Sequence, residues 1–208
     1  LSNNSNLLSK RTIVIPAFVL ILLGIYGSVT LKHIKIWSND ITLWNAALKR
    51  FDNIPFAYMN RGAAKLLLGD YNEALLDLEK ALRLKPNYPE AYFNRASVYF
   101  KTGYYDKSLI DLNTVIKLNP TITQAFYLRA EINIKTGNYR MAVDDLDKFI
   151  SLTSPEDSLK AYYRRAIAYS KLGDYKQTIR DLDTFIYLAS KVYFPYNSDT
   201  TTIKTEDI

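Results

Sequence analysis

Large apolar, small and glycine positions recur along residues 55–190 with a period close to 34 residues. Aligning Gly69, Gly103, Gly137 and Gly173 gives spacings of 34, 34 and 36 residues. Positions within each unit are counted here from its first residue, and the four units begin at Pro55, Pro89, Thr123 and Leu159. A period of this length predicts pairs of antiparallel helices that stack as a solenoid.

Each recurring position has a physical reason. Positions 8 and 20 hold small residues, which would let two helices cross closely, while positions 4, 24 and 30 are large and would fill the space around the crossing. The glycine at position 15 is expected to end the first helix with a positive φ. The tyrosine at position 17 is expected to begin the second helix.

These recurring residues resemble the tetratricopeptide repeat family, and the resemblance covers residues 55–190. It implies an all-α fold, a superhelical solenoid of antiparallel helix pairs. The segment around Trp44 and Ala47 matches the second helix of such a unit, at positions 24 and 27. We therefore expect a half-repeat that caps the N-terminal end of the array.

The expected organisation has eight parts. They are a polar loop (1–11), a transmembrane helix with its interfacial flank (12–36), a capping half-repeat (39–52), four repeats (55–88, 89–122, 123–158 and 159–190) and a disordered polar tail (191–208). The third repeat includes a two-residue insertion.

Residues 12–31 form a run of 20 residues without a charge, about the length that crosses a bilayer as a helix. Basic residues flank the run on both sides, and Trp37 follows where an interfacial aromatic residue would sit. The sequence therefore predicts a membrane protein with a single span in this chain, in contact with the lipid bilayer. The numbers of basic residues on the two sides are equal, so they do not give the orientation.

An arginine at position 7 and an aspartate at position 23 recur in every unit. We interpret them as structural ion pairs between helices, because a basic ladder that binds a ligand would vary between units. Pairing within a unit would give four bridges, and pairing to the next unit would give three. The residues are Arg61, Asp77, Arg95, Asp111, Arg129, Asp145, Arg165 and Asp181.

The concave groove is the candidate site, since first-helix positions 2, 5, 9, 12 and 13 line it in the family that the chain resembles. Aromatic and apolar residues at positions 5 and 12, with lysines at position 13, suit an extended peptide that carries some negative charge. Some of these side chains could instead pack between units. The expected groove residues are Met59, Asn60, Phe93, Asn94, Phe100, Lys101, Tyr127, Lys135, Tyr163 and Lys171.

Composition excludes several other chemistries. The chain has no cysteine and one histidine, His33, so neither a cysteine-ligated nor a histidine-rich metal site can form. No phosphate-binding glycine motif is present, and we expect no cofactor, no metal and no enzyme activity in this chain. The net charge of +6 is too mild to indicate nucleic acid.

Three roles are compatible with this sequence. The favoured one is a membrane-anchored module that binds protein or peptide partners and scaffolds a complex. The order of span, half-repeat and repeats is also similar to the C-terminal region of polytopic O-mannosyltransferase-like proteins, which implies an accessory domain that holds an acceptor on the periplasmic or lumenal side. A periplasmic glycan-binding module is the third.

The sequence also resembles in part a subfamily that grips the acidic C-termini of chaperones with a clamp of asparagine and basic residues. Asn60, Asn94 and Lys135 match positions of that clamp, but Phe56 and Glu131 occupy positions where it needs a basic residue.

Overall fold

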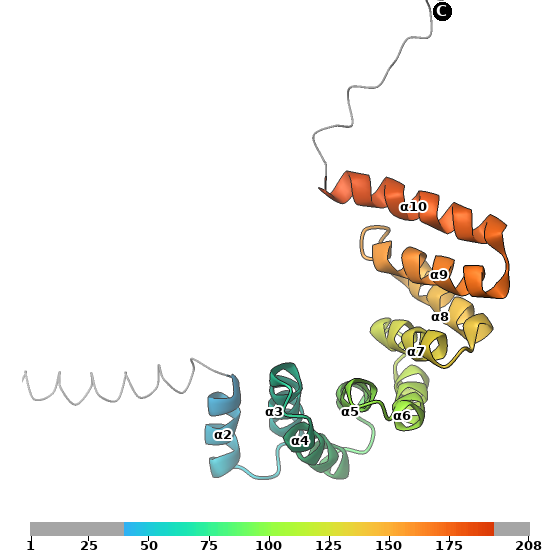
Figure 1. Cartoon of the computed structure of the whole chain (residues 1–208). Coiled ribbons are helices and arrows are strands. Elements are labelled where there is room, and N and C mark those ends of the chain that lie inside the picture. Colours follow the sequence, from blue (N-terminus) through green and yellow to red (C-terminus); the bar gives the residue numbers. More distant parts are fainter. Residues whose placement is uncertain (1–39, 194–208) are drawn as a thin grey trace, which may run out of the picture.

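The computed structural model describes residues 40–193, which form a curved row of α-helices (Figure 1). The helices are α2 (Asp40–Arg50), α3 (Pro55–Leu68), α4 (Tyr71–Leu84), α5 (Pro89–Lys101), α6 (Tyr105–Leu118), α7 (Gln124–Lys135), α8 (Tyr139–Leu152), α9 (Leu159–Leu172) and α10 (Tyr175–Tyr193). No strand occurs among these residues. The predicted all-α solenoid is confirmed for this part of the chain.

A left-handed glycine separates the two helices of each unit. The four glycines at position 15 have φ between 78° and 84°, as the sequence predicts. A side chain at that φ would be strained, so glycine is the residue that allows this tight turn. Each second helix then begins at the tyrosine of position 17.

Small residues let the two helices of a unit cross closely. Ala74, Ser108 and Ala142 at position 20 are completely buried. The buried Ser108 hydroxyl donates a hydrogen bond of 2.8 Å to the carbonyl oxygen of Ala96, which occupies position 8 of the same unit. Three hydrophobic clusters continue this packing along the array, and each joins residues of adjacent units.

Neighbouring first helices contact one another along the row, from α3 to α5, α5 to α7 and α7 to α9. The second helices α4, α6, α8 and α10 make no such contacts with one another. A stack whose units are closer together on one side must curve toward that side. The first helices therefore line the inner face of the curve, and the second helices lie outside.

The predicted half-repeat corresponds to α2, which packs on α3. The ring of Trp44 meets the ring of Phe56 edge-on, with 5.5 Å between the centroids. The polar loop (1–11), the predicted span with its flank (12–36) and residues 194–208 of the tail lie outside the described residues. Residues 191–193, predicted from the sequence to belong to a disordered tail, instead form the end of α10. Among the helices between residues 40 and 193, none has the length and apolar character to cross a bilayer.

Candidate functional site

The inner face presents positions 2, 6 and 13 of the first helices. At about 100° per residue, these three positions fall within about 40° of one another around the helix. Position 13 is exposed in all four units. It is a leucine in the first unit and a lysine in the other three: Leu67, Lys101, Lys135 and Lys171.

The three position-13 lysines form a row along α5, α7 and α9, which we call the lysine row. Their ammonium groups make none of the ion pairs found between residues 40 and 193. Two further basic residues of α9, Lys160 at position 2 and the half-buried Arg164 at position 6, lie on the same face. The inner face of the last units is therefore basic.

Met59 is not part of the groove surface, which corrects the expectation from sequence. Its side chain is only 8% exposed and belongs to the core cluster that α3 shares with α4 and α5. The amide nitrogen of Asn94 lies 3.3 Å from its sulfur. Alanine at position 27 of this unit, Ala81, leaves room for the thioether to turn inward, where burial of its apolar surface is favourable.

The predicted aromatic residues of the groove are partly covered by packing between units. Phe93 and Phe100 pack against one core cluster and Tyr127 against another, and all three are half-buried. Tyr163, on α9, is the most exposed of the position-5 residues at 44%. An incoming side chain would therefore meet less of the first three rings than of Tyr163.

Aromatic rings line a cavity of about 290 Å³ between units 3 and 4. Tyr163 lies 5.5 Å from Phe185 between ring centroids, and Tyr127 lies 5.3 Å from Phe149. The lining residues are Tyr127, Leu159, Lys160, Tyr163, Arg164 and Phe185. The cavity thus has an apolar floor with two cationic groups beside it.

A buried acid next to this cavity, Glu131, was not recognised from the sequence as a partner of Arg164. The Glu131 side chain is 14% exposed, and its Oε1 lies 2.7 Å from Nε of Arg164 without hydrogen-bond alignment. Burial raises the pKa of Glu131, and the positive charges of Arg164 and Lys135 oppose that shift. Burial also raises the pKa of the neighbouring Tyr127. The opposite charges of Glu131, at position 9 of the third unit, and Arg164, at position 6 of the fourth, could have indicated this pair from the sequence.

The amides at position 6 are engaged within the protein. Asn60 donates to the carbonyl oxygen of Phe56 at 2.8 Å, and Asn94 contacts the Met59 sulfur. Position 6 is Leu128 in unit 3 and Arg164 in unit 4. The four-unit array therefore has no repeated asparagine clamp on its inner face.

All four arginines at position 7 bind the aspartate at position 23 of their own unit, at 2.6 to 2.8 Å. Each uses its Nε and Nη2 atoms in a two-pronged contact, and the aspartate side chains are 3–7% exposed. Position 7 lies about 160° around the helix from position 5. These charges therefore lie away from the groove.

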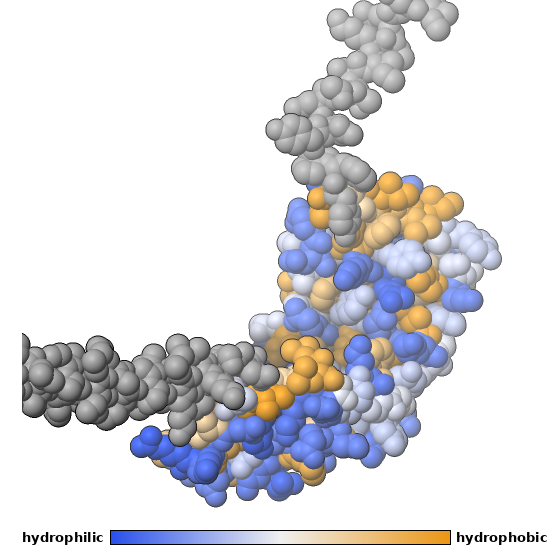
Figure 2. Space-filling view, turned by 60° about the vertical axis from the view of Figure 1, so that its left-hand side comes forward, coloured by the Kyte–Doolittle hydropathy of each residue, from blue (hydrophilic) through white to orange (hydrophobic). Residues whose placement is uncertain are grey.

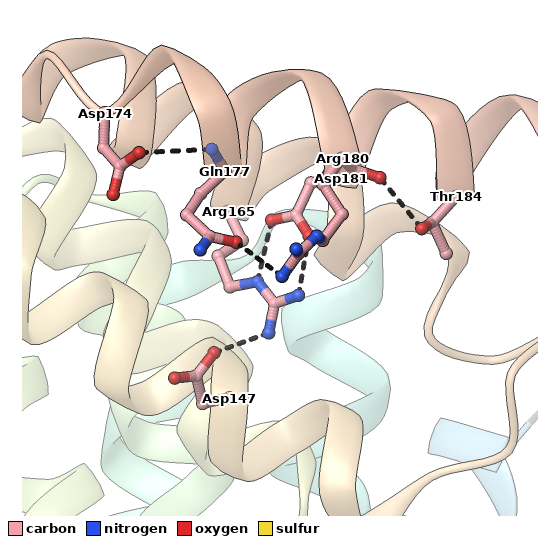
Figure 3. Close-up of polar contacts among 7 residues, drawn as sticks. All are labelled: Asp147, Arg165, Asp174, Gln177, Arg180, Asp181 and Thr184. Carbon is pink, nitrogen blue, oxygen red and sulfur yellow. Dashed lines mark hydrogen bonds and ion pairs between the residues drawn. The ribbon is translucent and has the colours of Figure 1, made fainter.

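Three of these arginines also bind the preceding unit, a contact that was not expected from the sequence. Nη1 of Arg165 donates to Asp147 on α8, while its other nitrogens hold Asp181 on α10 (Figure 3). Arg61 and Arg129 bind Asn45 and Asn113 in the same way. The acceptors occupy position 25, which is polar in every unit, and that recurrence was the available signal.

The fold and this inner face define an α-solenoid built from repeated helix pairs. Sequence models described as TPR repeat and tetratricopeptide repeat match residues 62–103, 89–122, 123–155 and 159–191. The chain belongs to the tetratricopeptide repeat family. No curated protein matches the chain.

Solved structures show the same fold. A MamA structure from Desulfovibrio magneticus RS-1 is 21% identical with a TM-score of 0.68, and the match covers 81% of this chain and 95% of that one. YrrB, described as a TPR protein with an unusual peptide-binding site, is 19% identical with a TM-score of 0.61, and the match covers 80% and 81%. A tetratricopeptide repeat protein from Parabacteroides merdae is 27% identical with a TM-score of 0.62, and the match covers 83% and 65%.

Proposed function

We propose that the chain is a membrane-anchored interaction module that holds an acidic, extended peptide of a partner protein in the groove of its first helices. The observation that carries the proposal is the lysine row beside the aromatic cavity of units 3 and 4. Carboxylates of the ligand would face the lysine row, and one apolar side chain would enter the cavity between Tyr127 and Tyr163. The peptide-binding site described for the similar protein YrrB supports a peptide as ligand.

The electrostatics favour an acidic rather than a basic ligand. Lys101, Lys135 and Lys171 are exposed and make no ion pair between residues 40 and 193. Glu131, by contrast, is largely covered and already lies against Arg164. A ligand carboxylate would therefore meet three cations that make no ion pair in this part of the chain, whereas a ligand cation would meet only one exposed acid at the inner-face positions, Glu90 at position 2 of α5.

A selection from random peptides tests this proposal. The purified chain would be used to select from a displayed library of twelve-residue peptides, and a glycan array would be probed in parallel. We expect selected peptides to share acidic residues next to an apolar or aromatic residue. Selection of basic peptides, or binding to glycans with no peptide selected, would contradict the proposal.

The membrane anchor rests on the 20 uncharged residues 12–31, which are long enough to span a bilayer. In the second candidate role, this run would be the last span of a polytopic glycosyltransferase-like protein, and the repeats would hold its acceptor. The order of a span, a Trp44-containing half-repeat and repeats favours that alternative. An immunoblot of native membranes with antibodies to residues 40–190 separates the two, because a polytopic parent would give a band much larger than 23.9 kDa.

A further inference from the structure

The interfaces between units have a common pattern on the second helices. In the first three units, the apolar residues at positions 21 and 28 pack in clusters that include the first helix of the next unit. The residues are Leu75 and Leu82, Leu109 and Ile116, and Val143 and Ile150. Because the two positions are seven residues apart, they lie on one side of the helix.

The first helices meet this row with small or branched apolar residues that are also seven residues apart, at positions 3 and 10. They are Ala91 and Val98 on α5, Ala125 and Ile132 on α7, and Ala161 and Ala168 on α9. All six are completely buried. An alanine at position 3 recurs in every unit, which lets the two helices approach closely.

On α10 the same row is uncovered. Ile179 and Ile186, at positions 21 and 28, are 61% and 63% exposed. Tyr175 at position 17 is exposed as well, although the equivalent tyrosines of the other units are half-buried. Figure 2 shows hydrophobic side chains gathered at the α10 end of the array.

A cavity of about 330 Å³ lies between α9 and α10 next to this row. It is lined by Tyr163, Ala166, Ile167, Ser170, Lys171, Thr178 and Leu182. The second helix is also longer here, since α10 has 19 residues and α4, α6 and α8 have 14 each. We call the exposed surface of Tyr175, Ile179 and Ile186 with this cavity the end face.

We propose that the end face binds an amphipathic helix of a partner protein, one that presents an alanine at a position i and a second small or branched apolar residue at i+7. The proposal rests on continuity with the interfaces inside the array, where the same positions are covered three times by helices of this pattern. The partner helix would take the place that the first helix of a following unit occupies.

A folded second copy of the chain does not offer such a helix. The position-3 alanines of all four first helices, Ala57, Ala91, Ala125 and Ala161, are at most 1% exposed because they already face a second helix. Residues 194–208 contain no alanine and include three consecutive threonines, which are weak helix formers. A helix of a partner protein therefore fits the end face better than a second copy of this chain or residues 194–208.

The test uses a peptide with the sequence of residues 89–101, which carries the alanine and valine of α5; it is labelled at its N-terminus with the zwitterionic dye tetramethylrhodamine and amidated at its C-terminus. Its net charge is +1, so the lysine row does not attract it and the result does not depend on the groove proposal. Fluorescence anisotropy would measure its affinity for the full chain. We expect saturable binding that weakens at least tenfold in the variant Ile179→Glu/Ile186→Glu.

Leu76→Glu/Ile110→Glu is the matched control, because these two residues are similarly exposed, at 59% and 66%, but lie at position 22 of α4 and α6. We expect this variant to bind the peptide like the unmodified chain, and circular dichroism would check that both variants keep their helices. A peptide with Ala91→Glu and Val98→Glu should not bind.

Three results would overturn the proposal. The first is no binding to the unmodified chain, or equal loss in both variants. The second is binding that emerges only when residues 194–208 are removed, which would assign the end face to the tail. The third is a dimer of the unmodified chain, measured by analytical ultracentrifugation, that Ile179→Glu/Ile186→Glu converts to a monomer.

Discussion

Position 8 illustrates how a single residue sets the distance between the two helices of a unit. It is glycine in the first unit and alanine in the other three. A Cβ atom at Gly62 would lie 2.8 Å from Cγ of Leu78 and 3.2 Å from the carbonyl oxygen of Ala74. Leu78 is completely buried, so it has little freedom to move away.

Gly62→Ala is therefore expected to destabilise the protein in spite of the better helix propensity of alanine. The propensity gain is about 1 kcal/mol in a helix interior. Overpacking of a tight core costs about 1–3 kcal/mol. We expect a lower midpoint in urea unfolding, and a midpoint above that of the unmodified protein would show that α3 and α4 have room to separate.

Glu131 gives a prediction about pH. Its pKa is raised by burial, so its contribution to stability is fully present below the ordinary Glu pKa of about 4.3 and is lost as the pH rises through its higher folded-state value. Glu131→Gln removes this titration.

The stability of Glu131→Gln relative to the unmodified protein should therefore increase between about pH 4 and pH 7. Urea unfolding of both proteins at several pH values measures the difference. A difference that stays constant over this range would contradict the assignment of Glu131 as a buried carboxyl group with a raised pKa.

The turns and crossings were predictable from single residues, because glycine at position 15 and small residues at position 20 have one geometric role each. The groove was less predictable. Burial of the Met59 side chain depends on the small size of Ala81 in another helix. An alignment of the repeats compares one position at a time and does not include such contacts between positions. The same is true of Glu131, whose burial depends on Arg164 of the next unit.

At the level of helices, the arginine contacts connect elements that are distant in sequence. Each position-7 arginine joins the two helices of its unit, and Arg165 also reaches α8 of the unit before. The opposite charges at positions 7 and 23 were predictable from their recurrence. The second contact was not, because the acceptors at position 25 change between asparagine and aspartate.

Asp111→Asn tests whether these pairs stabilise the array. The Asp111 side chain is 3% exposed, and its replacement would leave the Arg95 guanidinium partly buried without its anion. Removal of one partner of a buried pair costs about 3–5 kcal/mol, and the 21% exposure of Arg95 places the expected loss near the lower end. Urea unfolding measures it.

Glu79→Gln is the control for that variant. Glu79 faces Arg83 at 4.0 Å on the surface of α4, where an ion pair contributes at most about 0.5 kcal/mol. Arg95→Met/Asp111→Leu should recover much of the stability that Asp111→Asn loses, because it leaves no buried charge. Equally small losses of unfolding free energy in Asp111→Asn and Glu79→Gln would contradict a stabilising role for the Arg–Asp pairs of positions 7 and 23.

Over the whole molecule, repetition made the fold predictable and left the function open. The period and its glycines identify helix pairs, and stacking of such pairs gives a curved solenoid. Repetition does not reveal where the array differs from unit to unit. The lysines of the lysine row could be named from the sequence because they recur at position 13, whereas the cavity at Tyr163 and the end face come from differences between units and needed the packed structure.

The central claim is that the basic groove recognises an acidic peptide. The most direct measurement is the affinity of an acidic peptide from the library selection, by fluorescence anisotropy, for the variant Lys101→Glu/Lys135→Glu/Lys171→Glu. The control, Lys107→Glu/Lys117→Glu/Lys148→Glu, changes the net charge equally at exposed lysines of α6 and α8.

We predict that the groove variant binds the peptide at least about tenfold more weakly, a loss of about 1.4 kcal/mol in binding free energy, and that the control variant changes little. Binding to the unmodified chain should also weaken at high salt. Equal loss in both variants, or affinity unaffected by the groove lysines, would contradict the account.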